Sequence, residues 1–237
     1  MTTRVEVFPD EESGARAVAD ALAARLRPTG THHIVLTGGG IGTRVLAELA
    51  ALSDSIDWQR VHMWWGDERF LPPGDSERNE TGARAALLDV VPVPADHVHV
   101  MPADHGQGPE AAAMAYADEL ADASEDGFVP DFDVVLLGMG PEGHVASLFP
   151  GMPALHASGS TTAVWDSPKP PPTRLTLTLN AIRSAREVWV VAAGEAKAEA
   201  VAMALAEGTT AQECPAAGAR GREGTIFWLD RAAAGQS

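Results

Sequence analysis

Short apolar segments alternate with longer, alanine-rich segments along almost the whole chain. The runs at 34–36 and 134–137 are continuously apolar, which is typical of strands buried on both faces of a parallel sheet. The pattern predicts strands at Val5–Phe8, His33–Thr37, Val61–Trp65, Val98–Met101, Phe132–Leu137, Arg174–Leu179, Val188–Ala193 and Thr225–Leu229. It predicts helices at Glu11–Arg27, Thr43–Leu52, Glu77–Leu88, Pro109–Ala123 and Glu195–Glu207. This alternation predicts an α/β fold, a three-layer α/β/α arrangement with a mainly parallel, Rossmann-like sheet.

The chain shows no sequence sign of a second folding unit. Its 237 residues contain no internal repeat and no long linker, and α/β folds of this length commonly form one domain. The proline-rich segment Ser167–Pro172 is too short for a spacer, and its stiff backbone would present Lys169 in a fixed direction. We therefore expect a single domain, residues 1–237, with a loop from Cys214 to Gly224.

The charge balance restricts the possible partners. A formal net charge of −16 argues against binding to nucleic acid or to anionic membranes. It would also repel a phosphorylated ligand at long range, so such a ligand would need a local cluster of backbone amides, Arg and Lys. A single cysteine, Cys214, rules out an intrachain disulfide and fits a reducing compartment. We expect a cytoplasmic protein, a monomer or small homo-oligomer, without a signal peptide or membrane span.

Three unusual loops each follow a predicted strand, and ligands of open α/β sheets gather at the carboxyl ends of the strands. The first loop is Thr37–Gly42, in which glycines precede a predicted helix. Free amides and the helix dipole make such a turn an anion site, here formed by Gly38, Gly39 and Gly40. A tight turn without a ligand is the alternative. The loop lacks the Lys-Ser/Thr ending of a nucleotide P-loop.

The second loop is Gly66–Pro72, with the consecutive charges Asp67, Glu68 and Arg69. Arg69 could bind a phosphate or carboxylate through two parallel hydrogen bonds. Asp67 or Glu68 could fix Arg69 or orient a histidine. Taken alone, the loop fits a solvated turn with surface ion pairs equally well.

The third loop, Gly138–Gly151, reads GMGPEGHVASLFPG and contains His144. Its start fits G-x-G-x-x-G, but Pro150 and Pro153 stop any helix soon afterwards, which disfavours nucleotide binding. An imidazole exchanges protons near neutral pH, so His144 is a candidate catalytic base. A histidine that only caps a turn is the alternative.

Two further features have weaker chemical meaning. His97 and His99 would share one face of a strand, but no third metal ligand has suitable local spacing, so we expect structural histidines. Cys214 has no recognisable base nearby in the sequence. We predict no metal and no organic cofactor.

Together these loops resemble the 6-phosphogluconolactonase family, in the wider group that includes glucosamine-6-phosphate isomerase/deaminase. The similar segments are the glycines after the second strand, W-x-DERF-x-P, GMGPEGH-x-x-SLFPG, SPKPPP-x-R-x-TLTL and GE-x-K before the last helix. The deaminase relatives usually carry an Asn-Glu-Pro turn after their Gly-His. Ser147–Gly151 differs from that turn, and the resemblance therefore points to the lactonases.

The resemblance implies hydrolysis of 6-phospho-D-glucono-1,5-lactone in the oxidative pentose phosphate pathway, without a metal or organic cofactor. His144 looks like the general base, and Asp67 looks like an orienting carboxylate. Phosphate or developing negative charge would be bound by Gly38, Gly39, Gly40, Arg69 and Lys169, with Arg174 as a further candidate.

Two positions depart from the family pattern, because Gly40 replaces a common Ser and Glu142 replaces a common Asp. The first change removes a hydroxyl contact, and the second leaves the role of Glu142 open. An amino-sugar-phosphate deaminase and a non-catalytic sugar-phosphate sensor are the alternative functions.

Overall fold

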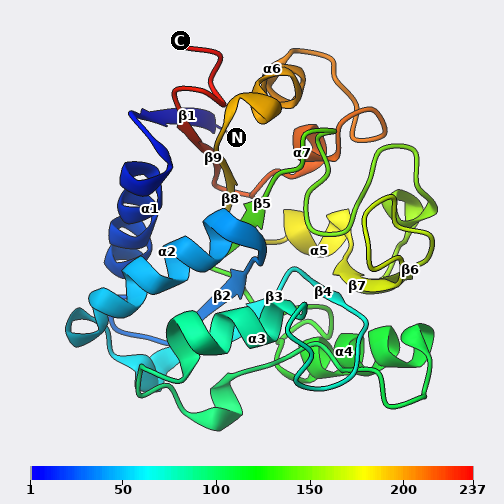
Figure 1. Ribbon diagram of the computed structural model, residues 1–237. Helices are drawn as coiled ribbons and strands as arrows, with labels where there is room; N and C mark the ends of the chain where they lie inside the picture. Colours follow the sequence, from blue (N-terminus) through cyan, green and yellow to red (C-terminus); the bar gives the residue numbers. More distant parts are fainter. Residues whose placement is uncertain (1, 237) are drawn as a thin grey trace.

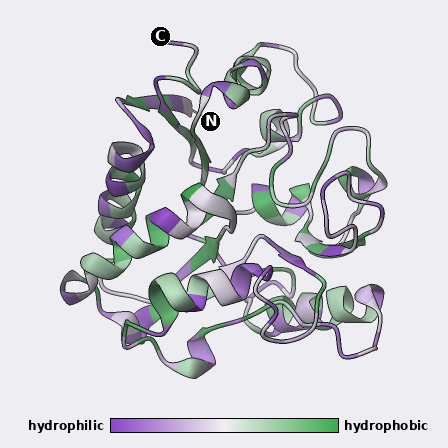
Figure 2. Ribbon diagram, viewed as in Figure 1, coloured by the Kyte–Doolittle hydropathy of each residue, from purple (hydrophilic) through white to green (hydrophobic). Residues whose placement is uncertain are grey.

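The computed structural model describes residues 2–236, and its centre is a six-stranded sheet in the order β1-β9-β8-β5-β2-β3 (Figure 1). All neighbouring strands in this sheet are parallel. The strands are β1 Thr2–Phe8, β2 His32–Leu36, β3 Val61–Trp65, β5 Val134–Gly138, β8 Glu187–Ala192 and β9 Gly224–Asp230. Side chains of β2, β5 and β8 are buried on both faces, and the strands appear as the green interior of Figure 2. The apolar runs thus form the sheet expected from the sequence.

Helices cover both faces of the sheet. They are α1 Glu11–Arg25, α2 Gly39–Ala51, α3 Asn79–Ala83, α4 Pro109–Asp122, α5 Leu179–Arg183, α6 Ala198–Leu205 and α7 Pro215–Gly218. The chain runs from β1 through β2 to the edge strand β3, and then returns through β5, β8 and β9. Since parallel crossovers are right-handed, α1 and α2 lie on one face and α4 and α6 on the other (Figure 1). The predicted three-layer α/β/α fold is confirmed.

A second, antiparallel sheet, which the sequence pattern does not reveal, has the order β4-β7-β6. Its strands are β4 Asp67–Arg69, β7 Arg174–Leu177 and β6 Thr161–Val164. The DER segment is too short and too polar to predict β4, and β6 is equally short. The strand expected at Arg174–Leu179 ends earlier, because Thr178 caps α5 with its hydroxyl oxygen, which accepts from the Ala181 amide.

Several predicted boundaries are wrong. Val98–Met101 is not a strand: only Val98 bridges to Met63, and Pro102 directly after the segment lacks an N–H for a ladder. The helix expected at Glu77–Leu88 begins at Asn79 and ends in a π-helical turn. The helix expected at Glu195–Glu207 begins as a 3₁₀ turn and becomes α-helical only at Ala198. The expected loop after Cys214 contains α7.

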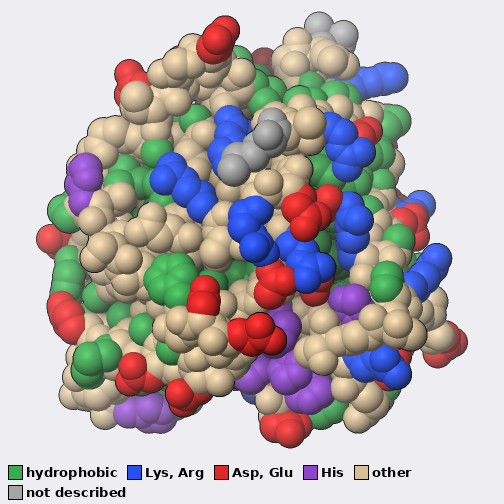
Figure 3. Space-filling model, turned by 180° about the vertical axis from the view of Figure 1, so that it is seen from behind, with side chains coloured by type: hydrophobic (Ala, Val, Ile, Leu, Met, Phe, Trp, Pro, Cys, Tyr) green, Lys and Arg blue, Asp and Glu red, His purple; other side chains and the backbone are tan. Residues whose placement is uncertain are grey.

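A cluster of histidines lies near the amino ends of β2 and β3. The His62 ring stacks on His97 with centroids 3.9 Å apart, and its Nδ1 lies 3.0 Å from His99 Nε2. The cluster also contains His33, stacked on His62, and Trp64, stacked on His99. Figure 3 shows histidine side chains gathered in one patch low on the back of the molecule. These contacts agree with the expectation of structural histidines at His97 and His99.

The histidine cluster should make the protein sensitive to mild acid. Burial and the neighbouring histidines lower the pKa of His33 and that of His62 to about 4, whereas an unfolded histidine titrates near 6.5. The unfolded chain therefore binds more protons in this window, so stability is full above pH 6.5 and falls as the pH drops towards 4. The charges of His97 and His99 lower the pKa of His62, and the charge of Asp96 raises it. His33 also stacks on His62, and Glu119 contacts His99 from the other side. We expect the thermal midpoint to fall between pH 7 and pH 5, and to fall less in His62→Gln.

The control for this experiment is His156→Gln, which replaces an exposed histidine outside the cluster. It should reproduce the wild-type slope of midpoint against pH. Equal slopes for wild type and His62→Gln would contradict the linkage.

Within residues 2–236, no helix is both long and apolar enough to cross a membrane.

Candidate active site

A cleft of about 400 Å³ opens at the carboxyl ends of β2 and β5. The chain leaves β2 towards β3 and leaves β5 in the opposite direction towards β8, so these neighbouring strands form the switch point at which ligands usually bind in open α/β folds. The lining residues include every site residue expected from the sequence: Gly38, Gly39, Gly40, Asp67, Arg69, His144, Lys169 and Arg174. The three predicted loops therefore meet in one place.

The glycine segment forms the first turn of a helix. Helix α2 begins at Gly39, not at Thr43 as expected, and Gly38 occupies the N-cap without a side-chain hydrogen bond. The amides of this turn are left for a ligand, with the positive end of the helix dipole behind them. The geometry fits an anion site.

Gly38 is required by a close neighbour, Asn79. A Cβ at Gly38 would lie only 1.8 Å from Asn79 Oδ1. This amide oxygen accepts from Arg69 Nη1 at 2.7 Å, and Asn79 Nδ2 donates to the backbone oxygen of Asp67 at 2.8 Å. Among residues 2–236, buried Arg69 Nε has no hydrogen-bond partner, which leaves one N–H of this cleft residue unused. Asn79 thus positions Arg69, a role that no local pattern in the sequence indicates.

Removing the Asn79 amide should weaken ligand binding. Asn79→Ala takes away one of two oxygens that hold Arg69 Nη1, the other being the Glu77 carbonyl. We expect kcat/KM for the lactone that the sequence resemblance implies to fall on the order of tenfold, as for loss of a hydrogen bond to a charged group. Steady-state kinetics would measure this. Asn180→Ala, which alters an exposed side chain outside the cleft, should leave kcat/KM unchanged. An unchanged value in Asn79→Ala would contradict the role.

The two carboxylates of the DER segment have different hydrogen-bond partners. Glu68 is 1% exposed and accepts the backbone N–H groups of Arg69 and Asn79 at 2.7 and 2.6 Å, which joins β4 to the start of α3. Burial raises its pKa despite these bonds. Asp67 Oδ2 accepts from the Ser147 hydroxyl at 2.6 Å, so Asp67 joins β4 to the loop that carries His144. Its Oδ1 accepts from Asn79 Nδ2 at 3.3 Å, so the carboxylate contacts both Ser147 and Asn79.

His144 lies on a turn that closes on itself. The Gly140 amide donates to the His144 carbonyl and the Gly143 amide donates to the Gly140 carbonyl, each at 3.0 Å. The imidazole stacks on Phe149 with centroids 4.3 Å apart. Burial lowers the pKa of His144 to about 4, which the nearby Glu142 only partly offsets. The ring is therefore neutral at pH 7 and able to accept a proton. A histidine that only caps a turn would not need this property.

Glu142 is the carboxylate nearest to this imidazole. Its Oε1 lies 3.1 Å from His144 Nδ1, and its Oε2 lies 3.2 Å from Lys169 Nζ. Burial alone would raise its pKa, but its own backbone N–H, His144 and Lys169 together hold the pKa below the usual value. The contact has the distance of an ion pair without the alignment of a hydrogen bond, and the nearby carboxylate charge favours a proton on Nδ1, which would leave Nε2 as the acceptor. The longer Glu side chain thus reaches both partners.

Lys197 also lines the cleft, and burial followed by the charge of Lys169 lowers its pKa. The resemblance includes the GE-x-K segment, but the sequence analysis does not predict its lysine as a site residue. Lys169, Lys197 and Arg69 give the cleft a local positive charge in a strongly acidic chain. This is the cluster that capture of a phosphorylated ligand would need.

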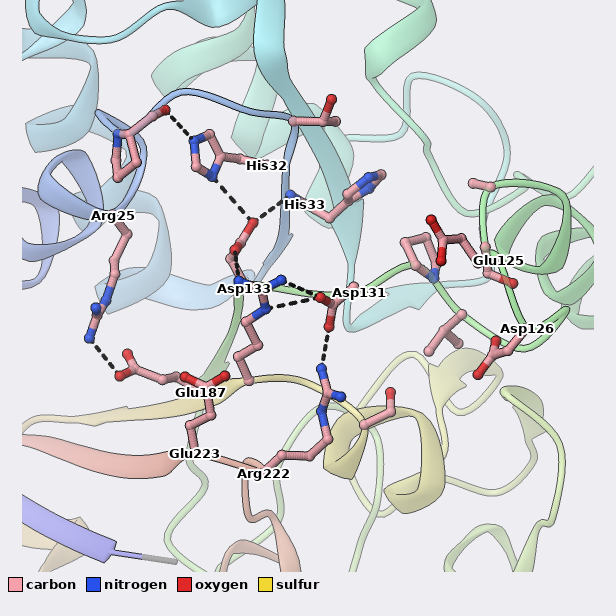
Figure 4. A pocket seen from close by; sticks show the side chains of 18 of the residues that line it. Arg25, His32, His33, Glu125, Asp126, Asp131, Asp133, Glu187, Arg222 and Glu223 are labelled. Carbon is pink, nitrogen blue, oxygen red and sulfur yellow. Dashed lines mark hydrogen bonds and ion pairs between the residues drawn. The ribbon is translucent and has the colours of Figure 1, made fainter.

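A larger hollow of about 950 Å³ lies near the amino ends of the strands (Figure 4). Its three arginines are already paired: Asp131 binds Arg186 and Arg222, and Arg25 Nη2 lies 2.5 Å from Glu187 Oε1. None of the three candidate loops reaches it. Within residues 2–236, no group of three or more His, Cys, Asp or Glu side chains is placed to hold a metal ion.

Known proteins match this chain over nearly its whole length. The sequence model for glucosamine-6-phosphate isomerases/6-phosphogluconolactonase matches residues 10–228. A 6-phosphogluconolactonase of Streptomyces coelicolor is 52% identical, over 99% of this chain and 95% of that protein. One of Mycobacterium tuberculosis is 47% identical, over 99% and 98%. The solved structure of 6-phosphogluconolactonase from Thermotoga maritima has a TM-score of 0.85 and 26% identity, and covers 97% of this chain and all of that one. The chain belongs to the glucosamine-6-phosphate isomerase/6-phosphogluconolactonase family.

Proposed function

We propose that this protein is a 6-phosphogluconolactonase, which hydrolyses 6-phospho-D-glucono-1,5-lactone to 6-phospho-D-gluconate in the second step of the oxidative pentose phosphate pathway. The observation that carries the proposal is the neutral, partly buried His144 beside Glu142, in a cleft lined by cationic side chains and the start of α2. Relatives about half identical over their full length bear this name.

The reaction needs only moderate assistance, because a δ-lactone is an activated ester. His144 Nε2 takes a proton from water while the water oxygen bonds to C1. Glu142 holds the proton on Nδ1 and stabilises the imidazolium that forms. One positioned imidazole contributes about a hundredfold or more.

The intermediate carries an oxyanion at C1, which Arg69 or backbone amides of the cleft can stabilise. When it collapses, the bond from C1 to the ring oxygen breaks, and the imidazolium returns its proton to that oxygen. The carboxylic acid produced then ionises to the carboxylate of the product. His144 ends neutral and ready for another cycle.

The phosphate supplies binding energy away from the reacting carbon. One side of the cleft combines the amide donors of Gly39 and Gly40 at the start of α2 with the cationic side chains of Lys169 and Lys197. Fixing the phosphate there aligns C1 with the water near His144. The missing serine hydroxyl at Gly40 leaves this task to backbone amides and lysines.

The deaminase alternative has less support from the loop after His144. There Phe149 stacks on the imidazole and Ser147 donates to Asp67, so this segment supplies no carboxylate to the cleft. A non-catalytic sensor would have no need of a neutral base held by a carboxylate.

The deciding experiment is pH-monitored hydrolysis of freshly prepared 6-phosphogluconolactone, with the spontaneous opening subtracted. We expect strong acceleration over the background and no ammonia release from glucosamine 6-phosphate. Ammonia release without lactone hydrolysis would establish the deaminase, and binding without turnover would establish the sensor.

We also propose that residues 1–237 form one domain and that the protein is a monomer or small homo-oligomer. We propose that it acts in the cytoplasm without a metal or cofactor. The single cysteine, the acidic composition and the enzyme's metabolic substrate support this.

A further inference from the structure

The proline-rich segment Ser167–Thr173 carries Lys169 into the cleft, but it cannot stabilise itself. Four of its seven residues are prolines, which have no N–H to donate. The backbone bond from the Ser167 amide to the Pro172 carbonyl, at 2.9 Å, closes its ends. The carbonyl groups between these ends need donors from elsewhere.

Arg174 supplies these donors. Its Nη2 donates to the carbonyls of Lys169 and Pro170 at 3.1 and 3.0 Å, and its Nε donates to the Pro171 carbonyl at 3.2 Å. Three consecutive carbonyls of the segment therefore converge on one guanidinium.

The surroundings of Arg174 fix it in place. The residue is 5% exposed, its Nη1 lies 3.9 Å from Asp67 Oδ2, and its guanidinium lies 6.0 Å from the centre of the Phe149 ring. Burial lowers its pKa, and the charge of Asp67 opposes this effect. Within residues 2–236, the Nε and Nη2 groups of Arg174 are occupied by carbonyls of the segment, and Nη1 is the nitrogen of this guanidinium without a hydrogen bond.

Arg69 offers a direct contrast, since it stands opposite Arg174 in the pairing of β4 with β7. In the described part of the chain, Arg69 Nε has no hydrogen-bond partner, whereas Arg174 Nε donates to the Pro171 carbonyl. Of two arginines on neighbouring strands, only Arg69 has this donor free for a ligand.

We propose that Arg174 is a positioning residue, which holds the segment 167–173 so that Lys169 Nζ stays beside Glu142 in the cleft, and that it acts through Lys169 without binding the phosphate itself. The assignment rests on the proposed function, because Lys169 is a ligand only for an anionic substrate. It is an alternative to the phosphate contact that the sequence analysis expects for Arg174.

A double-mutant cycle tests this, with Arg174→Lys, Lys169→Met and the double variant assayed for lactone hydrolysis. A lysine cannot serve three carbonyls at once, so Arg174→Lys should raise KM about tenfold with kcat changed less than about threefold. In the Lys169→Met background the same substitution should change KM by less than about twofold. Multiplying effects would overturn the proposal, because they would mean that Arg174 contacts the substrate independently.

Arg69→Lys is the matched comparison, and its effect should multiply with that of Lys169→Met. Melting curves identify a variant that fails to fold, and Arg174→Gln, which keeps an amide donor, then takes its place in the cycle. The same cycle on the affinity for 6-phosphogluconate, by calorimetry, separates the two proposals. Absent turnover with a non-additive affinity cycle would remove the proposed function and retain the role of Arg174.

Discussion

Replacing His144 by alanine is expected to lower kcat by about a hundredfold or more, while affinity for the phosphosugar product stays within about threefold. The imidazole is the neutral base of the cleft, and the phosphate-binding groups at α2, Lys169 and Lys197 are left in place. Turnover above the spontaneous rate and calorimetric binding of 6-phosphogluconate measure the two parts separately.

The control is His156→Ala, an exposed histidine outside the cleft, which should keep wild-type kinetics. Full activity of His144→Ala would contradict its assignment as base. Loss of product binding along with turnover would mean that the imidazole serves recognition more than proton transfer.

The main sheet could be predicted from the sequence because its strands are locally obvious. Segments such as Val134–Leu137 are apolar at every position, and no other local structure suits such a short run between glycine and polar residues. Because ligands of open α/β sheets bind at the carboxyl ends of the strands, the loops that carry Gly38, Arg69 and His144 are expected to meet in one cleft. The position of the site follows from the strand order and needs little further information.

The supporting contacts could not be predicted, because each joins residues far apart in the chain. Ser147 bonds to Asp67, and Asn79 holds Arg69 while packing against Gly38. A polar residue in a loop gives no sign of such a partner. The contacts of Arg174 have a sign in the neighbouring sequence. Prolines have no N–H group, so the carbonyls of a proline-rich segment need a donor from a nearby residue.

The alternation of β4 explains how three adjacent charged residues serve three purposes. Asp67 and Arg69 face the cleft, and both contact Asn79, while Glu68 between them is buried against the start of α3. Successive side chains of a strand point to opposite faces, so a polar triplet can build a site on one face and anchor it on the other. A solvated loop with surface ion pairs would show neither burial nor these contacts.

Gly140→Ala is expected to reduce kcat nearly as far as removal of His144 does, with little change in the thermal midpoint. A Cβ at this position would lie 2.0 Å from His144 Nδ1 and 2.6 Å from Glu142 Oε2. Real Cβ atoms do not approach so closely, so the imidazole must leave its place beside Glu142. A catalytic group displaced by about an ångström can cost on the order of a hundredfold in rate.

The comparison for this variant is Gly159→Ala, where the nearest atom to the new Cβ is the Thr161 carbonyl oxygen at 3.6 Å. That change adds a methyl group to another loop without touching the cleft, and should preserve activity. If Gly140→Ala kept wild-type kcat, the imidazole would be able to work from a second position, and its contact with Glu142 would not be needed for catalysis. If Gly140→Ala instead unfolded the protein, the turn itself would require the absence of a side chain at position 140. The expected result, a folded protein with a displaced base, separates the fold of the loop from the chemistry that it carries.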